Sequence, residues 1–215
     1  MSHNAIEPVV AHFLRSLMQA RSLASAAHQW LDPNFGPRSP LFSPSHTYAL
    51  IELAFLRSFL AWESFLEESF LLYILGKKPR HRKLARKRYV LPAGHKHAQT
   101  FLLPEGGSYA EWDKPDKVLA RANKLLRGGE PFESAISPRR NTLLDMHAIR
   151  NALVHRSDTS RLSFEKVARN SLGTLPPNIT VGSYLDTLLP HSTPPLTQLE
   201  AYLVAIEKAA DQIAR

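Results

Sequence analysis

The sequence of 215 residues contains no cysteine. Without cysteine the chain has no disulfide, no thiolate metal ligand and no cysteine nucleophile. This absence fits a reducing compartment, and we expect a cytoplasmic protein. The first ten residues also lack the basic stretch and apolar run of a secretory signal peptide.

Long uninterrupted hydrophobic runs are absent too. The most apolar region, Tyr48 to Leu75, is broken by the charged residues Glu52, Arg57, Glu63, Glu67 and Glu68. A bilayer-spanning helix needs roughly 20 mostly apolar residues. We therefore expect a soluble chain with no membrane partner, and its 44% hydrophobic content is ordinary for a globular protein.

Acidic residues are missing from one short segment, KKPRHRKLARKR, at positions 77–88. It contains eight basic residues, namely Lys77, Lys78, Arg80, Arg82, Lys83, Arg86, Lys87 and Arg88. Without these eight, 19 basic residues balance 19 acidic ones, so this segment carries the net charge of +8. Such local charge favours a polyanion contact, with nucleic acid as the leading partner. An anionic membrane surface and a solvated loop remain the alternatives.

Helical periodicity dominates the rest of the sequence. Apolar residues at intervals of three or four predict a helix from Pro8 to near Trp30, one from about Thr47 to Leu75, and a last one after Thr193-Pro194. Shorter helices are expected from Pro115 to near Gly128, from Pro138 to about Arg156 and over 163–172.

Proline and glycine mark irregular segments at 31–46, 89–112 and 173–192, with a basic loop at 77–91. A brief strand at 179–181 is a weak possibility. We expect one all-α domain over residues 1–215, a bundle of about five to six helices with long irregular insertions.

Residues 150–155 read Arg-Asn-Ala-Leu-Val-His. This hexapeptide resembles the Arg-x-x-x-x-His signature of the HEPN superfamily, in which a small polar residue commonly follows the arginine. The segment RSFLAWESFLEESF, at 57–70, also looks like the long helix of several HEPN branches. The resemblance implies a helical bundle, and many HEPN domains are metal-independent endoribonucleases of toxin–antitoxin and antiviral systems.

The residue types suit that chemistry. Metal-free RNA cleavage needs a base for the ribose 2′-hydroxyl, and histidine serves this role near neutral pH. A guanidinium offers bidentate contacts to the phosphate as charge develops there. We expect His155 to be the general base or acid, Arg150 the phosphate clamp, and Asn151 the residue that orients the imidazole or contacts the substrate. The resemblance implies products with a 2′,3′-cyclic phosphate and a 5′-hydroxyl.

The spacing raises a geometric question. At about 100° per residue, Arg150 and His155 lie roughly 140° apart around an ideal helix. Either the arginine side chain reaches round, or the helix ends near His155. The resemblance implies a symmetric homodimer with two copies of the motif at its interface. Ser157 stands where some HEPN toxins carry a tyrosine that a partner enzyme modifies, so that mode of silencing is in doubt here.

Other histidines are weaker candidates. His147, four residues before Asn151, extends the polar face but reads as a bystander. His95 and His97 lack further ligands at useful spacing, so we expect no metal site and no cofactor.

The sequence therefore predicts a ribonuclease that acts as a toxin or defence effector, with RNA, a second copy and an antitoxin or other regulatory protein as partners. The alternative is a non-catalytic HEPN module that binds nucleic acid or a protein.

Overall fold

A computed structural model describes residues 6–31, 43–77, 80, 94–102, 110–155, 157–189 and 192–215. These residues form helices and no β-strand, and an isolated bridge joins Leu188 to Thr197. The all-α prediction is therefore confirmed for the described chain. None of the helices in these ranges is long and apolar enough to cross a membrane.

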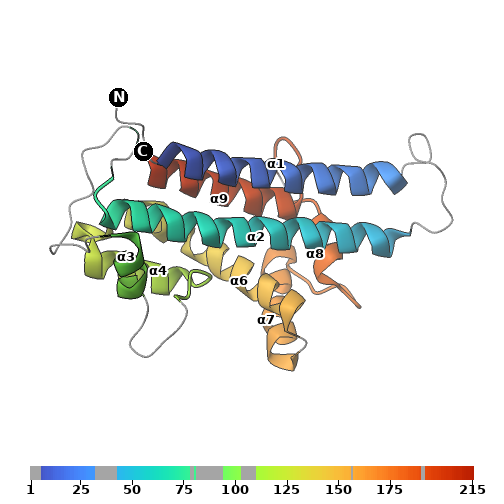
Figure 1. Cartoon of the computed structure of the whole chain (residues 1–215). Helices are drawn as coiled ribbons and strands as arrows, with labels where there is room; N and C mark the ends of the chain where they lie inside the picture. The colour runs from blue at the N-terminus through green and yellow to red at the C-terminus, as the bar shows by residue number, and fades with distance from the viewer. Residues whose placement is uncertain are drawn as a thin grey trace. The chain divides into compact units, whose positions relative to one another are not determined.

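The helices follow the order shown in Figure 1. The longer ones are α1 (Ile6–Leu31), α2 (Pro44–Ile74), α4 (Pro115–Leu125), α6 (Arg140–Val154), α7 (Asp158–Leu172) and α9 (Gln198–Ala214). The shorter ones are α3 (His95–Leu102), α5 (Phe132–Ile136), α8 (Val181–Asp186) and the 3-10 helices η1 (Arg127–Gly129) and η2 (Ser137–Arg139).

The chain divides into two compact units. Unit 1 comprises Met1–Leu14, Ala61–Leu144 and Ala205–Arg215, and unit 2 comprises Arg15–Leu60 and Asp145–Val204. Four helices, α1, α2, α6 and α9, contribute residues to both units. Each unit has its own core.

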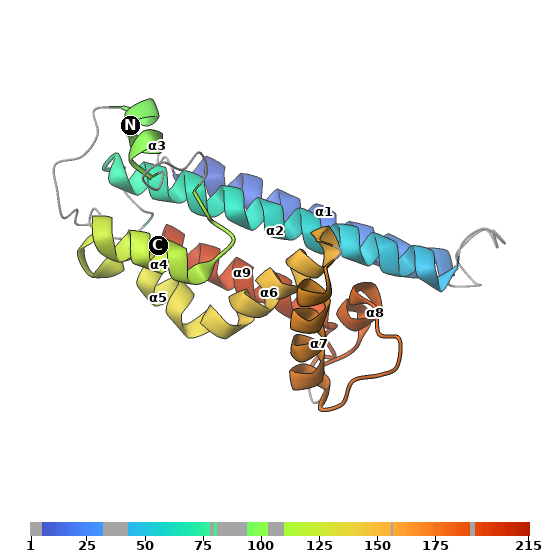
Figure 2. The same cartoon turned by 90° about the horizontal axis from the view of Figure 1, so that it is seen from below.

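The core of unit 1 is aromatic. The Phe70 ring of α2 lies 4.7 Å from the Phe132 ring of α5 and 5.6 Å from the Trp112 ring, measured between centroids. The Tyr73 hydroxyl donates to the Ile213 carbonyl of α9 at 2.6 Å, which satisfies a buried polar group. Helices α4 and α5 are neighbours in this unit (Figure 2). The aromatic residues of α2 in this unit therefore pack as core.

The core of unit 2 combines aromatic packing with buried hydrogen bonds. Phe55 of α2 packs edge-on against Tyr202 of α9, with 6.2 Å between ring centroids. The hydroxyls of Tyr202 and Tyr184 lie 2.9 Å apart, and the Tyr184 ring meets Phe164 of α7. Figures 1 and 2 both show the second half of α1 beside the first half of α2, where Thr47 Oγ1 donates to the Ala27 carbonyl.

Two segments that were predicted to be irregular contain helices. Helix α3 lies inside the segment 89–112, and α8 lies inside 173–192, where Val181 begins a helix instead of ending a strand. Helix α5 was also not expected, so the described chain has more helices than the five to six predicted. Residues 32–42, within the irregular segment 31–46, lie outside the described residues.

Helix α8 forms because both its start and its packing are specified. The Thr180 side chain accepts from the Ser183 backbone, and the Ser183 hydroxyl accepts from the Thr180 backbone, which makes a capping box. The Gly182 N–H donates to Glu52 Oε1 at 2.8 Å, and a Cβ on Gly182 would meet Tyr48 at 2.5 Å. Only a glycine allows this close approach between α8 and α2.

Two helix starts differ from prediction. The motif helix is predicted to begin at Pro138, but α6 begins at Arg140 after η2, and the Ser137 hydroxyl before it donates to Glu133 at 2.6 Å. Helix α7 begins at Asp158, five residues before the predicted start, because Ser157 caps it by accepting from the Ser160 N–H.

Candidate functional site

The predicted catalytic residues Arg150, Asn151 and His155 lie together on α6 and immediately after it, all within unit 2. Met146 and Ile149 are fully buried and fix the side of the helix that faces the core. His147, Arg150 and Asn151 fall on the remaining half-buried side. The helix therefore presents three polar side chains along one edge.

The end of α6 answers the question of how Arg150 approaches His155. Val154 is the last residue of the helix, and the His155 N–H still donates to the Asn151 carbonyl at 2.8 Å. His155 thus closes the final turn, with its side chain exposed. The Arg150 guanidinium reaches round the helix end, and its Nη1 lies 3.5 Å from His155 Nε2.

Arg150 is held in place by its neighbour. Its Nη1 donates to Asn151 Oδ1 at 3.1 Å. The other guanidinium nitrogens, Nε and Nη2, make no hydrogen bond to any residue that the structure describes. Among the described residues, the arrangement thus leaves two guanidinium nitrogens available for an anionic ligand, in the fork geometry that suits phosphate oxygens.

His147 belongs to the same cluster. Its Nε2 lies 2.9 Å from Asn151 Nδ2, one helical turn along α6. The spacing predicted that His147 extends the polar face of this helix, and the contact with Asn151 places it there. The signal was present in the spacing, because side chains four residues apart share a helix face.

The contact at 3.5 Å between Arg150 and His155 is long for a hydrogen bond. A guanidinium only donates, so a hydrogen bond here would need His155 Nε2 as the acceptor. An imidazole and a guanidinium thus lie next to each other at the end of α6. This pairing is what proton abstraction next to a phosphate requires.

The two described members of the basic segment differ in their surroundings. Lys77 is exposed. Arg80 belongs to unit 1, where its Nη2 donates to Glu7 at 2.6 Å and its Nη1 lies 3.7 Å from Asp211. The predicted contacts Lys78, Arg82, Lys83, Arg86, Lys87 and Arg88 lie outside the described residues. Arg80 thus has carboxylate partners already, unlike a cation free to meet a phosphate.

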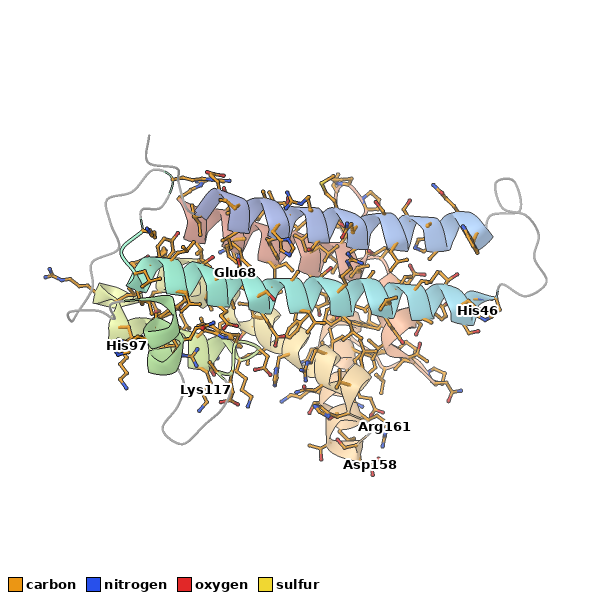
Figure 3. All side chains as sticks on the ribbon, in the orientation of Figure 1. His46, Glu68, His97, Lys117, Asp158 and Arg161 are labelled. Atoms are coloured by element: carbon orange, nitrogen blue, oxygen red, sulfur yellow. The ribbon has the colours of Figure 1, made fainter. Side chains whose placement is uncertain are left out.

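Unit 1 has a separate hollow of about 400 Å³, lined by Val9, Ser64, Glu67, Glu68, Leu71, Leu72 and Gln99. Figure 3 labels Glu68 on α2 and the exposed His97 on α3. Two carboxylates among apolar side chains repel phosphate, so this hollow does not suit RNA. In the described ranges no three His, Asp or Glu side chains come close enough to hold a metal ion.

Comparison with known proteins returns no family, since no protein-family model, curated protein or solved structure matches this chain. The resemblance to HEPN domains therefore remains a prediction from residues 150–155 and 57–70. At the end of α6, the Arg150 side chain contacts both Asn151 and His155.

Proposed function

We propose that this chain is a metal-independent endoribonuclease of the HEPN type. The observation that carries the proposal is the distance of 3.5 Å between Arg150 Nη1 and His155 Nε2 at an exposed helix end. A polymer can reach this site without entering a cavity. The residue types match the needs of 2′-hydroxyl attack, and no buried specificity pocket is required for a sequence-tolerant cut.

In the proposed reaction, neutral His155 takes the proton of a ribose 2′-hydroxyl, and the oxygen attacks the adjacent phosphorus. Arg150 binds the non-bridging phosphate oxygens as their negative charge grows. The P–O5′ bond breaks, which leaves a 2′,3′-cyclic phosphate on one fragment and a 5′-hydroxyl on the other. The departing 5′-oxygen takes up a proton from a general acid.

One imidazole cannot act as base and acid at the same moment, so we propose that two copies of the chain form a composite site. His155 of the second copy would then supply the proton for the 5′-oxygen. Val154, beside His155, is 50% exposed and would lie at such an interface. A twofold axis near α6 would bring two arginines and two histidines to one cleft.

We assign the protein to the toxin or defence-effector class, restrained by an antitoxin or other regulatory protein. An unrestrained nuclease acting on cellular RNA arrests its host, which is why such an enzyme needs a partner. A non-catalytic RNA-binding module is the second candidate. The two free guanidinium nitrogens of Arg150 favour it, because they bind phosphate without any proton transfer.

The test is cleavage of total RNA by the purified chain in EDTA. His155→Ala should reduce cleavage by about 10²–10⁴-fold, the usual contribution of an acid–base group, while RNA affinity stays. Arg150→Ala should lose a similar amount, and Arg150→Lys should recover little because it lacks the planar fork. Asn151→Ala should be milder, since it holds Arg150 and transfers no proton.

His97→Ala is the matched control, because His97 is also an exposed histidine but lies in unit 1, on α3 (Figure 3). It should cleave at the wild-type rate. Full cleavage by His155→Ala, or loss of wild-type cleavage in EDTA, would contradict the mechanism. Retained RNA binding without cleavage by any variant or the wild type would support the binding module.

A further inference from the structure

We propose that His147 is a positioning residue, whose neutral imidazole fixes the side-chain amide of Asn151 so that its oxygen holds Arg150. The proposal rests on the ribonuclease function above and extends the site by one helical turn. It is carried by three consecutive contacts, from His147 to Asn151, from Asn151 to Arg150, and from Arg150 to His155.

The first step is the orientation of the Asn151 amide. Its oxygen and nitrogen have the same shape, so only hydrogen-bond partners decide which end points where. A guanidinium has donors and no acceptor, and Arg150 Nη1 lies 3.1 Å from this amide. The atom facing Arg150 must therefore be Oδ1, and Nδ2 must face the other way.

The second step concerns the imidazole. An amide nitrogen only donates, and Asn151 Nδ2 lies 2.9 Å from His147 Nε2. The ring nitrogen must therefore accept, which requires a neutral His147 with its proton on Nδ1. A donor at this position would face the donor Nδ2. The amide would then turn over, so that Oδ1 faced His147 and Nδ2 faced Arg150.

A reversed amide would affect the clamp. Its Nδ2 would then face Arg150 Nη1, and two donors cannot bond to each other. The guanidinium would lose the hydrogen bond to Asn151 Oδ1, which holds it beside His155. His147 thus acts on the phosphate clamp through Asn151, without touching substrate.

The side chains that can replace His147 follow from this logic. His147→Gln keeps an acceptor at the same reach, and glutamine pairs well with asparagine four residues along a helix. His147→Leu keeps a strong helix former but removes the acceptor. The two variants separate acceptor chemistry from helix stability, because both residues favour helices.

The experiment combines imidazole NMR with cleavage kinetics. A long-range ¹⁵N–¹H spectrum of the wild type, assigned by the loss of signals in His147→Gln, should show His147 protonated at Nδ1 and bare at Nε2. The Asn151 side-chain amide signals should stay close to wild type in His147→Gln and move in His147→Leu. For RNA cleavage, His147→Gln should remain within about twofold, and His147→Leu should lose several-fold to about tenfold, as expected when a hydrogen bond between two neutral groups is lost and Oδ1 is no longer directed toward Arg150.

The outcomes separate the two proposals. A proton on His147 Nε2, or Asn151 amide signals that respond equally to both variants, would overturn the positioning role. If His155→Ala abolishes cleavage but His147→Leu cleaves like the wild type, the positioning role fails while the ribonuclease stands. If the wild type cleaves no RNA, the ribonuclease fails, and the NMR signals still decide whether His147 orients Asn151.

Discussion

Two half-buried carboxylates in unit 2 show how burial raises the pKa of an acidic side chain. Burial raises the pKa of Asp145 on α6 above its ordinary value of 3.8. Burial also raises the pKa of Glu52, although the hydrogen bond from the Gly182 N–H lowers it in part. The charged forms of both groups are disfavoured in the folded chain, so each lowers stability when it ionises.

Asp145→Asn should therefore stabilise the protein at neutral pH. The raised pKa means that the folded chain binds the Asp145 proton more tightly than the unfolded chain does. Its contribution to stability is fully present below pH 3.8 and is lost as the pH rises through the folded-state pKa. We expect the melting temperature of the variant to exceed that of the wild type by a few degrees at about pH 7. In a chain of this length, a shift of that size corresponds to roughly 1 kcal/mol of stability.

Asp116→Asn is the matched control with the opposite sign. The hydrogen bonds from Arg140, at 2.6 and 2.7 Å, lower the pKa of Asp116. Its contribution is present above the ordinary pKa and is lost as the pH falls, so the substitution should destabilise slightly at neutral pH. The effect should be small because the pair is exposed and screened. If calorimetry at several pH values gave both variants the same sign, burial would not be the cause at Asp145.

At the scale of elements, the start of α7 follows the site directly. Ser157, two residues after His155, accepts from the Ser160 N–H at 3.2 Å and caps the helix. Figure 3 shows Asp158 and Arg161 at this end of α7, where their side chains lie 3.5 Å apart. An acidic residue in the first turn suits the helix dipole.

Ser157→Ala should lower the free energy of unfolding by about 1 kcal/mol, the usual cost of a lost N-cap. Urea denaturation followed by circular dichroism measures it. Ser163→Ala on the same helix is the control, because the Ser163 hydroxyl donates to the Thr159 carbonyl inside the helix and caps nothing. Equal losses in the two variants would mean that the Ser157 hydroxyl has no special role.

The sequence predicted the long helices because each has a continuous apolar stripe. In α1 the buried residues Ile6, Val10, Phe13 and Leu17 recur every three or four positions. Helix α8 has six residues and depends on Glu52 and Tyr48 of α2, far away in the sequence. No local pattern could reveal that packing, although the Thr180 and Ser183 capping box was a local signal.

At the candidate site, the sequence motif identified Arg150, Asn151 and His155 but did not predict how their side chains approach one another. The decisive fact is that α6 ends at Val154, two residues before the predicted end near Arg156. The His147 contact followed from spacing alone, yet spacing does not reveal which of two partners an amide prefers.

At the scale of the whole molecule, charge is concentrated in the segment 77–88. We expect this segment to add affinity without specificity, because phosphates are alike in every sequence. Arg80 is a separate case, since Glu7 and Asp211 neutralise it. The remaining cations of the segment are the ones to test.

The combined variant Arg82→Ser, Lys83→Ser, Arg86→Ser and Lys87→Ser should weaken RNA binding and flatten its salt dependence. Each lost phosphate contact should reduce the slope of log affinity against log salt by about 0.7 for single strands. Turnover at saturating RNA should not change. Fluorescence anisotropy at several salt concentrations gives the slope.

Arg80→Ser is the control for that experiment. It should lower the melting temperature, because Glu7 loses its hydrogen bonds from Arg80 while Asp211 keeps its ion pair with Arg215, and should leave the salt slope nearly unchanged. An unchanged slope in the combined variant would show that this segment binds something other than RNA.

The proposed site lies within nine consecutive residues, from His147 to His155. Within one copy its geometry follows from the rise and rotation of one helix and from where that helix ends. Residues elsewhere must keep α6 formed and, for the composite site proposed above, bring two copies together. Such a site leaves most of the chain free to change during evolution. Descendants could exchange most core and surface residues, keep helix α6, and inherit the same chemistry in sequences that no longer resemble one another.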